Sequence, residues 1–431
     1  MIRNKSFHII ILFLITVSNL FFGWGFQNLT VFNVPIIYFL LIAMLININF
    51  KNNSQLFRET GIFNILSIYL IFNLIKIVLG YNKYGLVAIR DATFILDSFF
   101  LIAFIPFFKN DLINYKVLNK IFNFCFILLF FFVLTWFYQD FFITFSPKII
   151  SPIGSQTNLF FNYSTFNFLL FFFAFYSYFF LQGDFRKKFF FLLFSILTFI
   201  LDPKRTIYFS YFSIVIFLIF IDKKNIKLFT GIIIFLIFIQ IINLFNLFPN
   251  LKYQNMNFFD FFINHLLSSI PGYNVEGEYF QSTQSTATWR LEKWQETINY
   301  TFENNIRLLF GTYYGAPLTN FVNVEKIITR EPHNIYVSVF ARTGLIGSIL
   351  FFILHYKIFR VFINVYKKTI SLKLDDLKKI VLFLSIYTLF VFISGIFTAS
   401  LSTVYFSSQF YIFAGLILSI DSMLKNYKKN F

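Results

Sequence analysis

Twelve apolar segments dominate the sequence, and no other feature constrains the fold so strongly. A transmembrane helix needs roughly 20 apolar residues, because the hydrocarbon core of a bilayer is about 30 Å thick. The segments are 7–26, 31–50, 61–80, 92–108, 121–139, 164–182, 189–201, 207–221, 228–248, 334–354, 380–398 and 400–420. Two of them, 189–201 and 207–221, are short for a full crossing. The pattern predicts an all-α, polytopic integral membrane protein with about 12 transmembrane helices.

The composition excludes a soluble enzyme and a disordered chain. Hydrophobic residues make up 58% of the 431 residues and charged residues only 13%, with 73 Phe. Soluble domains are about 45–50% apolar and about 25% charged. A soluble fold of this size would leave too much apolar surface in water. Disorder in turn requires low hydrophobicity.

The net charge of +17 follows membrane topology and does not indicate nucleic acid as a partner. If the N-terminus lies inside, the inner segments hold 23 of the 36 Lys and Arg and 7 of the 19 acidic residues. The outer loops hold 11 of each. Because inner loops carry the excess of Lys and Arg, both termini are expected in the cytoplasm.

The spans divide the chain into three parts. Residues 1–248 carry about nine spans, residues 249–333 form one large outer loop, and residues 334–431 carry about three spans and a cytoplasmic tail. Within the loop, the stretch 287–309 has the apolar spacing of a helix, which Thr286 or Thr288 could cap.

Lys204 and Arg205 break the charge rule, because they lie in a tight outer turn between two short spans. One interpretation is snorkelling to the membrane interface, with Asp202 as partner. The other is an anion site, since a guanidinium binds phosphate in a bidentate way. Position alone does not separate the two.

Arg290 and Arg90 are two further outer cations. Arg290 lies in the loop helix just after Trp289, and Arg90 precedes Asp91 at the outer start of the fourth span. From position alone, a solvated helix face for Arg290 and a surface arrangement with Asp91 for Arg90 are favoured over function.

His333 lies at the outer mouth of the tenth span, directly after Pro332. Proline suits a helix start, so the imidazole is expected near a helix N-terminus, where the dipole favours its neutral form. A neutral imidazole can act as a base, although a single interfacial histidine is more often structural. No two of the four histidines have metal-ligand spacing and Cys125 is the only cysteine, so neither a metal site nor a cofactor is expected.

Arg342 lies nine residues beyond His333, about 13 Å deeper at helical rise. A membrane-embedded arginine faces the bundle or a cavity. Support of a polar network and contact with an anionic substrate are equally compatible with that position. The following Gly344-Leu345-Ile346-Gly347 supplies small residues for close helix packing.

Four motifs run in order through the second half of the chain. They are Thr288-Trp289-Arg290 through Trp294, the segment Phe310-Gly311-Thr312-Tyr313-Tyr314-Gly315, the segment Pro332-His333-Asn334-Ile335-Tyr336, and Gly344-Leu345-Ile346-Gly347. This order resembles the O-antigen polymerase/ligase family of bacterial inner-membrane glycosyltransferases. The motifs cover about 15% of the chain, from Thr288 to Phe352.

The resemblance implies roles for several residues. An outer arginine, an arginine of the large loop and a histidine near the loop's end correspond to Arg205, Arg290 and His333 as catalytic candidates. Lys204 stands beside Arg205 where a small or polar residue is common, which leaves open which of the two cations holds phosphate. Substrate-binding candidates are Lys204, Arg90, Asn334 and Arg342.

The resemblance also implies a substrate, partners and a location. The substrate would be an oligosaccharide on undecaprenyl pyrophosphate, used without metal at the periplasmic face of the inner membrane. Membrane lipid and a chain-length regulator protein are the further partners expected.

Three functions remain open from the sequence. The preferred one is a polymerase that joins lipid-linked repeat units of a surface polysaccharide. The alternatives are a ligase that transfers glycan to lipid A–core, and a transporter of lipid-linked oligosaccharide. A transporter usually shows repeated halves and midplane charges, whereas the unusual residues of this chain concentrate at the outer face.

Overall fold

The computed structural model describes most of the chain, and helices form nearly all of what it describes. The described residues are 2–32, 34–48, 50–108, 114–135, 138–150, 156–160, 205–221, 223, 237, 241, 258–268, 270, 273, 277–318, 321–322, 328–329, 331–398 and 400–429. The helices of the first half are α1 (Ile2–Phe21), α2 (Trp24–Asn28), α3 (Ile36–Ile46), α4 (Phe50–Glu59), α5 (Phe63–Tyr84), α6 (Leu86–Asp91), α7 (Thr93–Asp97), α8 (Phe99–Phe104), α9 (Asn114–Thr135) and α10 (Gln139–Thr144). Those of the second half are α13 (Arg205–Ile221), α15 (Phe258–Leu267), α16 (Glu278–Phe302), α17 (Asn305–Phe310), α18 (Ile335–Ser371), α19 (Asp375–Ser394), the 3-10 helix η3 (Ser400–Ser402) and α20 (Val404–Lys429).

Strands are confined to three small antiparallel pairs. Strand β1 (Thr30–Val31) pairs with β2 (Val34–Pro35), β3 (Lys148–Ile150) with β4 (Gln156–Asn158), and β5 (Phe321–Val322) with β6 (Ile328–Thr329).

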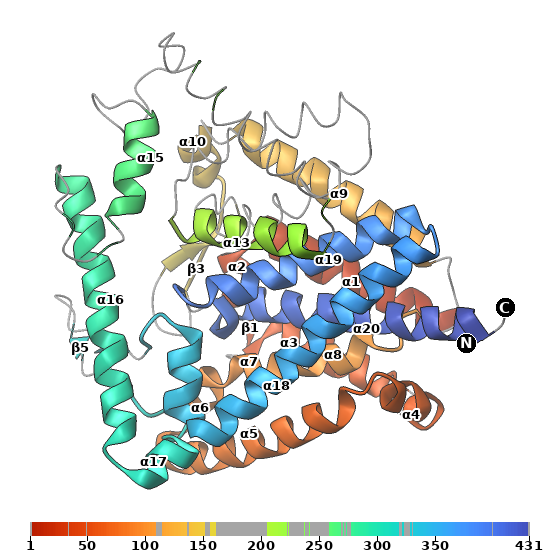
Figure 1. Ribbon diagram of the computed structural model, residues 1–431, viewed down its shortest axis with the longest axis horizontal. Coiled ribbons are helices and arrows are strands. Elements are labelled where there is room, and N and C mark those ends of the chain that lie inside the picture. Colours follow the sequence, from red (N-terminus) through yellow and green to blue (C-terminus); the bar gives the residue numbers. More distant parts are fainter. Residues whose placement is uncertain are drawn as a thin grey trace.

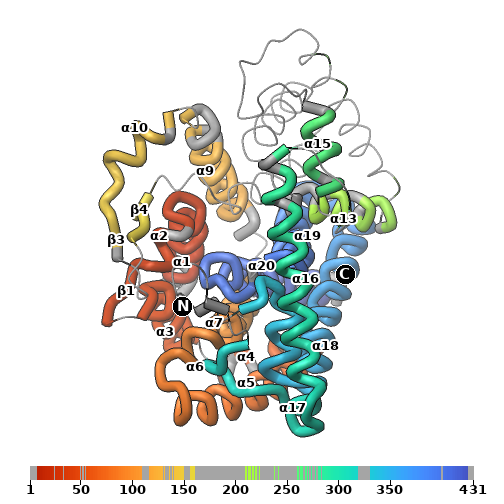
Figure 2. The backbone as a smooth tube through the Cα atoms, turned by 90° about the vertical axis from the view of Figure 1, so that its left-hand side faces the viewer, coloured from red at the N-terminus to blue at the C-terminus, as the bar shows by residue number. Residues whose placement is uncertain are grey.

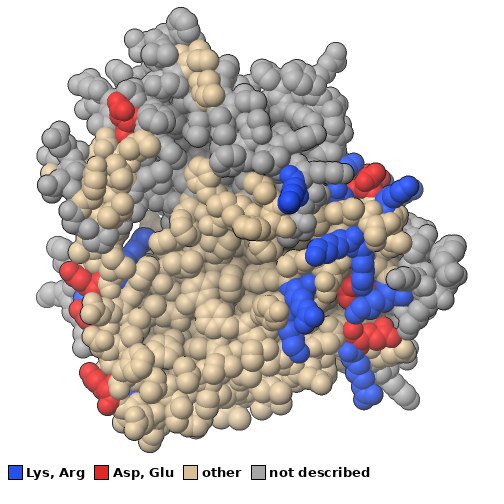
Figure 3. All heavy atoms as spheres, viewed as in Figure 1, with Lys and Arg blue, Asp and Glu red and all other residues tan. Residues whose placement is uncertain are grey.

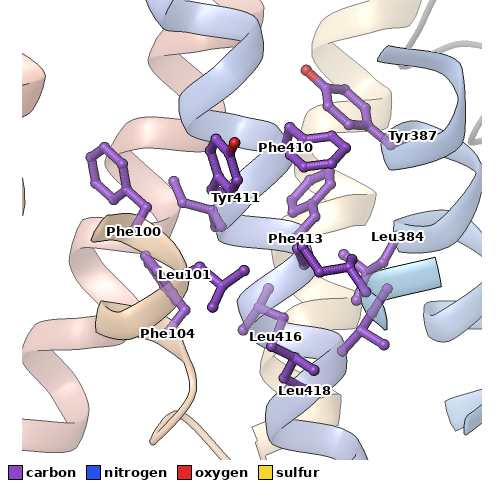
Figure 4. Close-up of a cluster of buried hydrophobic side chains, with 14 of the residues drawn as sticks. Phe100, Leu101, Phe104, Leu384, Tyr387, Phe410, Tyr411, Phe413, Leu416 and Leu418 are labelled. Atoms are coloured by element: carbon purple, nitrogen blue, oxygen red, sulfur yellow. The ribbon is translucent and has the colours of Figure 1, made fainter. Parts of the chain in front are cut away.

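Helix α20 forms the centre of the bundle. It packs against α8, α19 and α18 (Figure 1), and every residue from Val404 to Leu424 is buried. Figure 4 shows Phe410, Tyr411 and Phe413 of α20 between Phe100 of α8 and Tyr387 of α19. Helix α20 carries buried polar side chains, among them Gln409 and Asp421, which bond to Asn19 of α1 and Lys368 of α18. Because polar groups inside a membrane need protein partners, these contacts favour a central position for the last helix of the chain.

Four helices of the described part are long and apolar enough to cross a membrane. They are Phe63–Tyr84, Ile335–Ser371, Asp375–Ser394 and Val404–Lys425. Helix α5 carries a row of exposed apolar side chains, at Ile68, Ile71, Ile75 and Val78, as expected for a face that contacts lipid. The chain is therefore a membrane protein.

Charge is segregated on the surface. In Figure 3, Lys and Arg gather at the end of the molecule that holds both termini and the turn between α18 and α19, and a broad face without charge adjoins them. Lys367, Lys368, Lys373, Lys378 and Lys379 belong to this turn and its flanks. The exposed carboxylates of Glu296 and Glu303 lie on and just after α16, far from that basic end.

Several predicted spans correspond to helices with different bounds. The segments 61–80, 380–398 and 400–420 overlap α5, α19 and α20. The segment 92–108 is not one helix but the short α7 and α8, and the segment 31–50 begins with the β1–β2 hairpin before α3. The segments 164–182 and 189–201, and all of 228–248 except two single residues, lie outside the described residues.

The outer loop holds its main helix where it was expected, with different ends. Helix α16 begins after Gly277, so the prediction of a cap at Thr286 or Thr288 was wrong. The Thr286 hydroxyl donates to the Ser282 carbonyl one turn earlier, a bond that threonine makes inside a helix. The chain then turns at Asn304, whose side chain caps α17.

Helix α18 is broken at Gly344, and α17 packs into the break. Gly344 has a φ of 65°, and a Cβ there would lie 2.4 Å from the Leu309 carbonyl. At Gly311 a Cβ would lie 2.4 Å from Thr343 N. The expected close approach at these small residues is confirmed, and it comes with a kink. Lys76 of α5 stabilises the contact between α17 and α18, because its Nζ donates to the Phe310 carbonyl at the end of α17 at 2.8 Å.

Candidate active site

His333 lies between the outer loop and the membrane bundle. It occupies the second position before α18 and has a φ of 52°, a left-handed conformation that is uncommon outside glycine. Helix α16 holds the segment from one side, since Trp294 Nε1 donates to the Pro332 carbonyl at 2.7 Å. The bundle holds it from the other side, where Ile335 N donates to the Gly395 carbonyl. The Trp289 ring centre lies 6.0 Å from that of His333.

Arg290 of α16 reaches the same place. Its Nη1 donates to the Phe397 carbonyl at 3.1 Å, while its buried Nε has no hydrogen-bond partner. Burial lowers the pKa of Arg290, yet a guanidinium remains charged at neutral pH. Among the described residues, no carboxylate forms an ion pair with it. The positive charge therefore lacks a protein counter-ion in this part of the structure.

The environment of His333 favours its neutral form. The side chain is exposed, but the surrounding protein excludes part of its water, and this desolvation lowers the pKa. The nearby charge of Arg290 lowers the pKa of His333 further. At neutral pH the imidazole is therefore available as a proton acceptor beside a fixed cation. The sequence analysis predicted the neutral form of His333 from the helix dipole. In the structure, the pKa of His333 is lowered by desolvation and by the charge of Arg290.

Helix α13 brings its first turn toward this site. The Phe209 ring packs edge-on against the Phe397 ring at 5.1 Å, and Phe397 is the residue whose carbonyl binds Arg290. Arg205 is the first residue of α13, one turn before Phe209. Only the backbone of Arg205 is described, and Lys204 lies outside the described residues.

Arg342 has a different environment, buried among acidic side chains. Its Nη2 lies 3.1 Å from Asp91 Oδ2 and 3.8 Å from Glu331 Oε1, and its Nη1 donates to the Ala316 carbonyl at 3.3 Å. Ser402 donates to the other oxygen of Glu331. Burial raises the pKa of Glu331, which the charge of Arg342 partly offsets. This cluster joins α6, the end of the outer loop, α18 and η3.

The two remaining substrate-binding candidates have structural contacts. The Asn334 side chain accepts from Tyr336 N and Val337 N, which makes it the N-cap of α18. Arg90 is largely exposed and pairs with Asp91 at 3.3 Å, the carboxylate that also binds Arg342. These contacts account for both residues without a ligand, and their predicted role in binding stays a prediction.

Comparison with known proteins assigns this region to a family. Residues 190–352 match the family model described as O-antigen ligase. The chain carries an O-antigen ligase family domain. Members of this family are glycosyl-transferring enzymes. No curated protein matches the chain.

The O-antigen ligase domain includes most of the candidate residues. Lys204, Arg205, Arg290 and His333 fall within residues 190–352, as do Asn334 and Arg342. Arg90 lies outside the domain, and its partner Asp91, also outside it, pairs with Arg342 of the domain.

Metal ligands do not gather in the part of the O-antigen ligase domain that the structure describes. Across the described residues, no group of three or more His, Cys, Asp or Glu side chains could hold a metal ion. The described site offers a neutral imidazole, His333, beside the fixed guanidinium of Arg290.

Sequence reasoning missed three members of the site. Glu331 and Ser402 complete the Arg342 cluster, and the Phe397 carbonyl orients Arg290. Glu331 lies two residues before His333, so its place in the sequence was a signal that could have identified it. The other two follow α19 in the chain and carry no motif, so only the fold reveals them.

Proposed function

We propose that the chain is a glycosyltransferase that polymerises a surface polysaccharide from undecaprenyl-pyrophosphate-linked repeat units. The observation that carries the proposal is Arg290, a largely buried guanidinium without an acidic partner among the described residues, next to the exposed His333. A buried cation in this state is suited to an anion supplied by a substrate. The match to the O-antigen ligase family supports glycosyl transfer as the reaction class.

The reaction needs a base for the acceptor and a cation for the donor. The acceptor hydroxyl oxygen attacks the anomeric carbon of the donor sugar, and the bond from that carbon to the pyrophosphate oxygen breaks. Undecaprenyl pyrophosphate leaves with the electron pair, and its growing negative charge is stabilised by Arg290 and Arg205, with Lys204 assisting. His333 takes the proton of the attacking hydroxyl.

The low pKa of His333 suits the role of base. An imidazole with a lowered pKa is mostly neutral at pH 7 and can accept a proton in the transition state. Arg290 thus has two effects: it binds the anionic leaving group and keeps the base unprotonated until the acceptor arrives. Arg90, Asn334 and Arg342 would line the substrate's path as secondary contacts.

The proposal includes a location and partners. Both termini would lie in the cytoplasm of a bacterium and His333 at the periplasmic face of its inner membrane, an orientation supported by the basic end of the molecule. The polymer product makes a chain-length regulator protein an expected partner.

A ligase is the second candidate, and the description of the matched family model favours it. A ligase would use the same donor and transfer the finished glycan to lipid A–core. Both reactions break the same sugar–pyrophosphate bond, so the residues discussed would act alike in each.

A gel of lipopolysaccharide from a strain deleted for the gene tests the proposal. Core bearing one repeat unit, with the ladder lost, is the result expected for a polymerase. Bare core, with polymer accumulating on undecaprenyl pyrophosphate, would establish a ligase instead. An unchanged ladder would contradict a role in lipopolysaccharide.

A further inference from the structure

A cavity of about 440 Å³ opens beside the N-terminal half of α16, next to the candidate active site. Its lining residues are Tyr273, Gln281, Gln284, Ser285, Thr288, Trp289 and Glu292. The volume falls in the range of about 300–1,000 Å³ that is typical of small-molecule sites.

Helix α16 presents two opposite faces, and the cavity lies on the one turned away from the bundle. At 100° per residue, Gln281, Ser285, Thr288 and Glu292 share one face. The opposite face carries Arg290, Trp294, Thr297 and Thr301, and its members bond to Phe397, Pro332 and Leu318. Figure 2 shows α16 alongside the bundle, next to α18.

Trp289 lies on the helix between these two faces. It lines the cavity, and its ring also packs near His333 at 6.0 Å between ring centres. A molecule in the cavity that extends along Trp289 would therefore continue toward the proposed base.

The lining chemistry is that of a saccharide site. Two aromatic rings, Trp289 and Tyr273, provide apolar faces against which the C–H face of a sugar can pack. The amides of Gln281 and Gln284, the hydroxyls of Ser285 and Thr288 and the carboxylate of Glu292 provide donors and acceptors for sugar hydroxyls. No Lys or Arg lines the cavity among the described residues, so a phosphate group would find no cation there.

Hydrogen bonds hold one wall of the cavity in place before a ligand binds. Gln284 Nε2 donates to the Tyr273 carbonyl at 2.6 Å and to the Ile270 carbonyl at 3.1 Å. These bonds hold Ile270 and Tyr273 against α16, so a ligand need not order these two residues on binding.

We infer that this cavity is a saccharide subsite, which holds a sugar of the lipid-linked glycan beyond the residue that reacts. The inference rests on the proposed function, since it places the uncharged part of the same substrate. The pyrophosphate would lie toward Arg290, and the glycan would pass Trp289 into the cavity. Binding there supplies affinity and selects the repeat unit without touching the bond that breaks.

The test uses the full-length protein in proteoliposomes, with lipid-linked oligosaccharide purified from the host strain as donor and acceptor. The double variant Gln281→Ala/Glu292→Ala removes two polar side chains from the cavity face of α16, opposite the face that carries Arg290. Loss of one hydrogen bond lowers affinity roughly fivefold, so KM is expected to rise about 10- to 30-fold with kcat unchanged. The matched control is Asn299→Ala, an exposed residue on the same helix outside the cavity, which should leave KM unchanged.

A second measurement separates failure of the subsite from failure of the proposed function. The probe is the repeat-unit oligosaccharide freed of lipid and pyrophosphate by mild acid, and its binding is measured by saturation-transfer NMR. Wild-type protein that transfers glycan, together with an unchanged KM in the double variant, would overturn the subsite and leave the function standing. Wild-type protein that binds the free oligosaccharide without any transfer, with binding lost in the double variant, would overturn the function and leave the subsite. If the double variant unfolds at a lower temperature than wild type, the single variant Gln281→Ala is judged by the same KM criterion.

Discussion

Two arginines of the same domain show how a buried cation can serve either structure or chemistry. Arg342 is 1% exposed and has carboxylates of Asp91 and Glu331 within 4 Å. Arg290 is also largely enclosed, but it binds only the Phe397 carbonyl, and its Nε has no partner. The acidic side chains have already neutralised Arg342, whereas Arg290 retains a charge for something else to neutralise.

The difference explains why the position of a basic residue near a motif does not by itself show whether that residue has a structural or a chemical role. Charged groups removed from water need a counter-charge, and the protein supplies one where the group is structural. Where the described protein supplies none, next to an exposed imidazole, an anionic substrate is the natural counter-charge.

Replacing His333 with Ala should abolish transfer. General base catalysis contributes about 10²- to 10⁴-fold, and His333 is the proposed base beside Trp289 and Arg290. The measurement is the lipopolysaccharide ladder together with membrane levels of the protein by immunoblot. Normal product from the variant at normal protein levels would exclude His333 as the base.

Replacing Arg290 with Gln should lower kcat by about 100- to 1,000-fold, because the leaving pyrophosphate loses a fixed cation. The variant Arg290→Lys should recover only part of this, since an ammonium lacks the planar fork. A matched control is Arg307→Gln on α17, where the guanidinium already pairs with Glu303. Equal losses in the control and in Arg290→Gln would show that Arg290 is merely structural.

Arg342 and Arg90 form a matched pair for stability, since both bind Asp91. Arg342→Ala removes the buried cation beside Glu331, leaves Asp91 with only the half-exposed Arg90, and should cost about 3–5 kcal/mol of stability. Arg90, with 45% of its side chain exposed, should cost less than about 1 kcal/mol when replaced by Ala. Thermal unfolding in detergent compares the two, and a larger loss for Arg90→Ala would reverse the assignment.

The pH dependence should report the coupling between Arg290 and His333. A base works in its neutral form, so kcat/KM should fall as the pH drops through the pKa of His333, which lies below the ordinary value of 6.5. In Arg290→Gln the charge that lowers this pKa is gone, and the acid limb should move to higher pH. A limb that stays in place in the residual activity would mean that Arg290 does not act on His333.

The sequence predicted those helices whose own residues carry the signal, either a long apolar run or a helical spacing of apolar residues. The apolar runs of α5, α19 and α20 identify them as candidate spans, and the spacing of residues 287–309 identifies a helix in the loop. The breaks were not predictable from hydropathy, because the predicted spans 92–108 and 334–354 stay apolar on average even though Asp97-Ser98 and Arg342-Thr343 stand at the breaks. The sequence shows that residue 344 is a glycine. It does not show that the backbone of Leu309 in α17 occupies the space that a side chain at this position would need.

The amino-acid sequence alone predicts that the chain enters a membrane, and its motifs between Thr288 and Phe352 resemble those of the O-antigen polymerase/ligase family. Hydrophobicity and motif order are local properties that need no partner to be read. Which of the two arginines has a carboxylate partner becomes clear only from the folded structure. Arg290 meets a carbonyl 107 residues away, and Arg342 meets Asp91 from a helix in the first quarter of the chain. The role of a charge depends on the groups around it, and folding brings those groups together from distant parts of the chain.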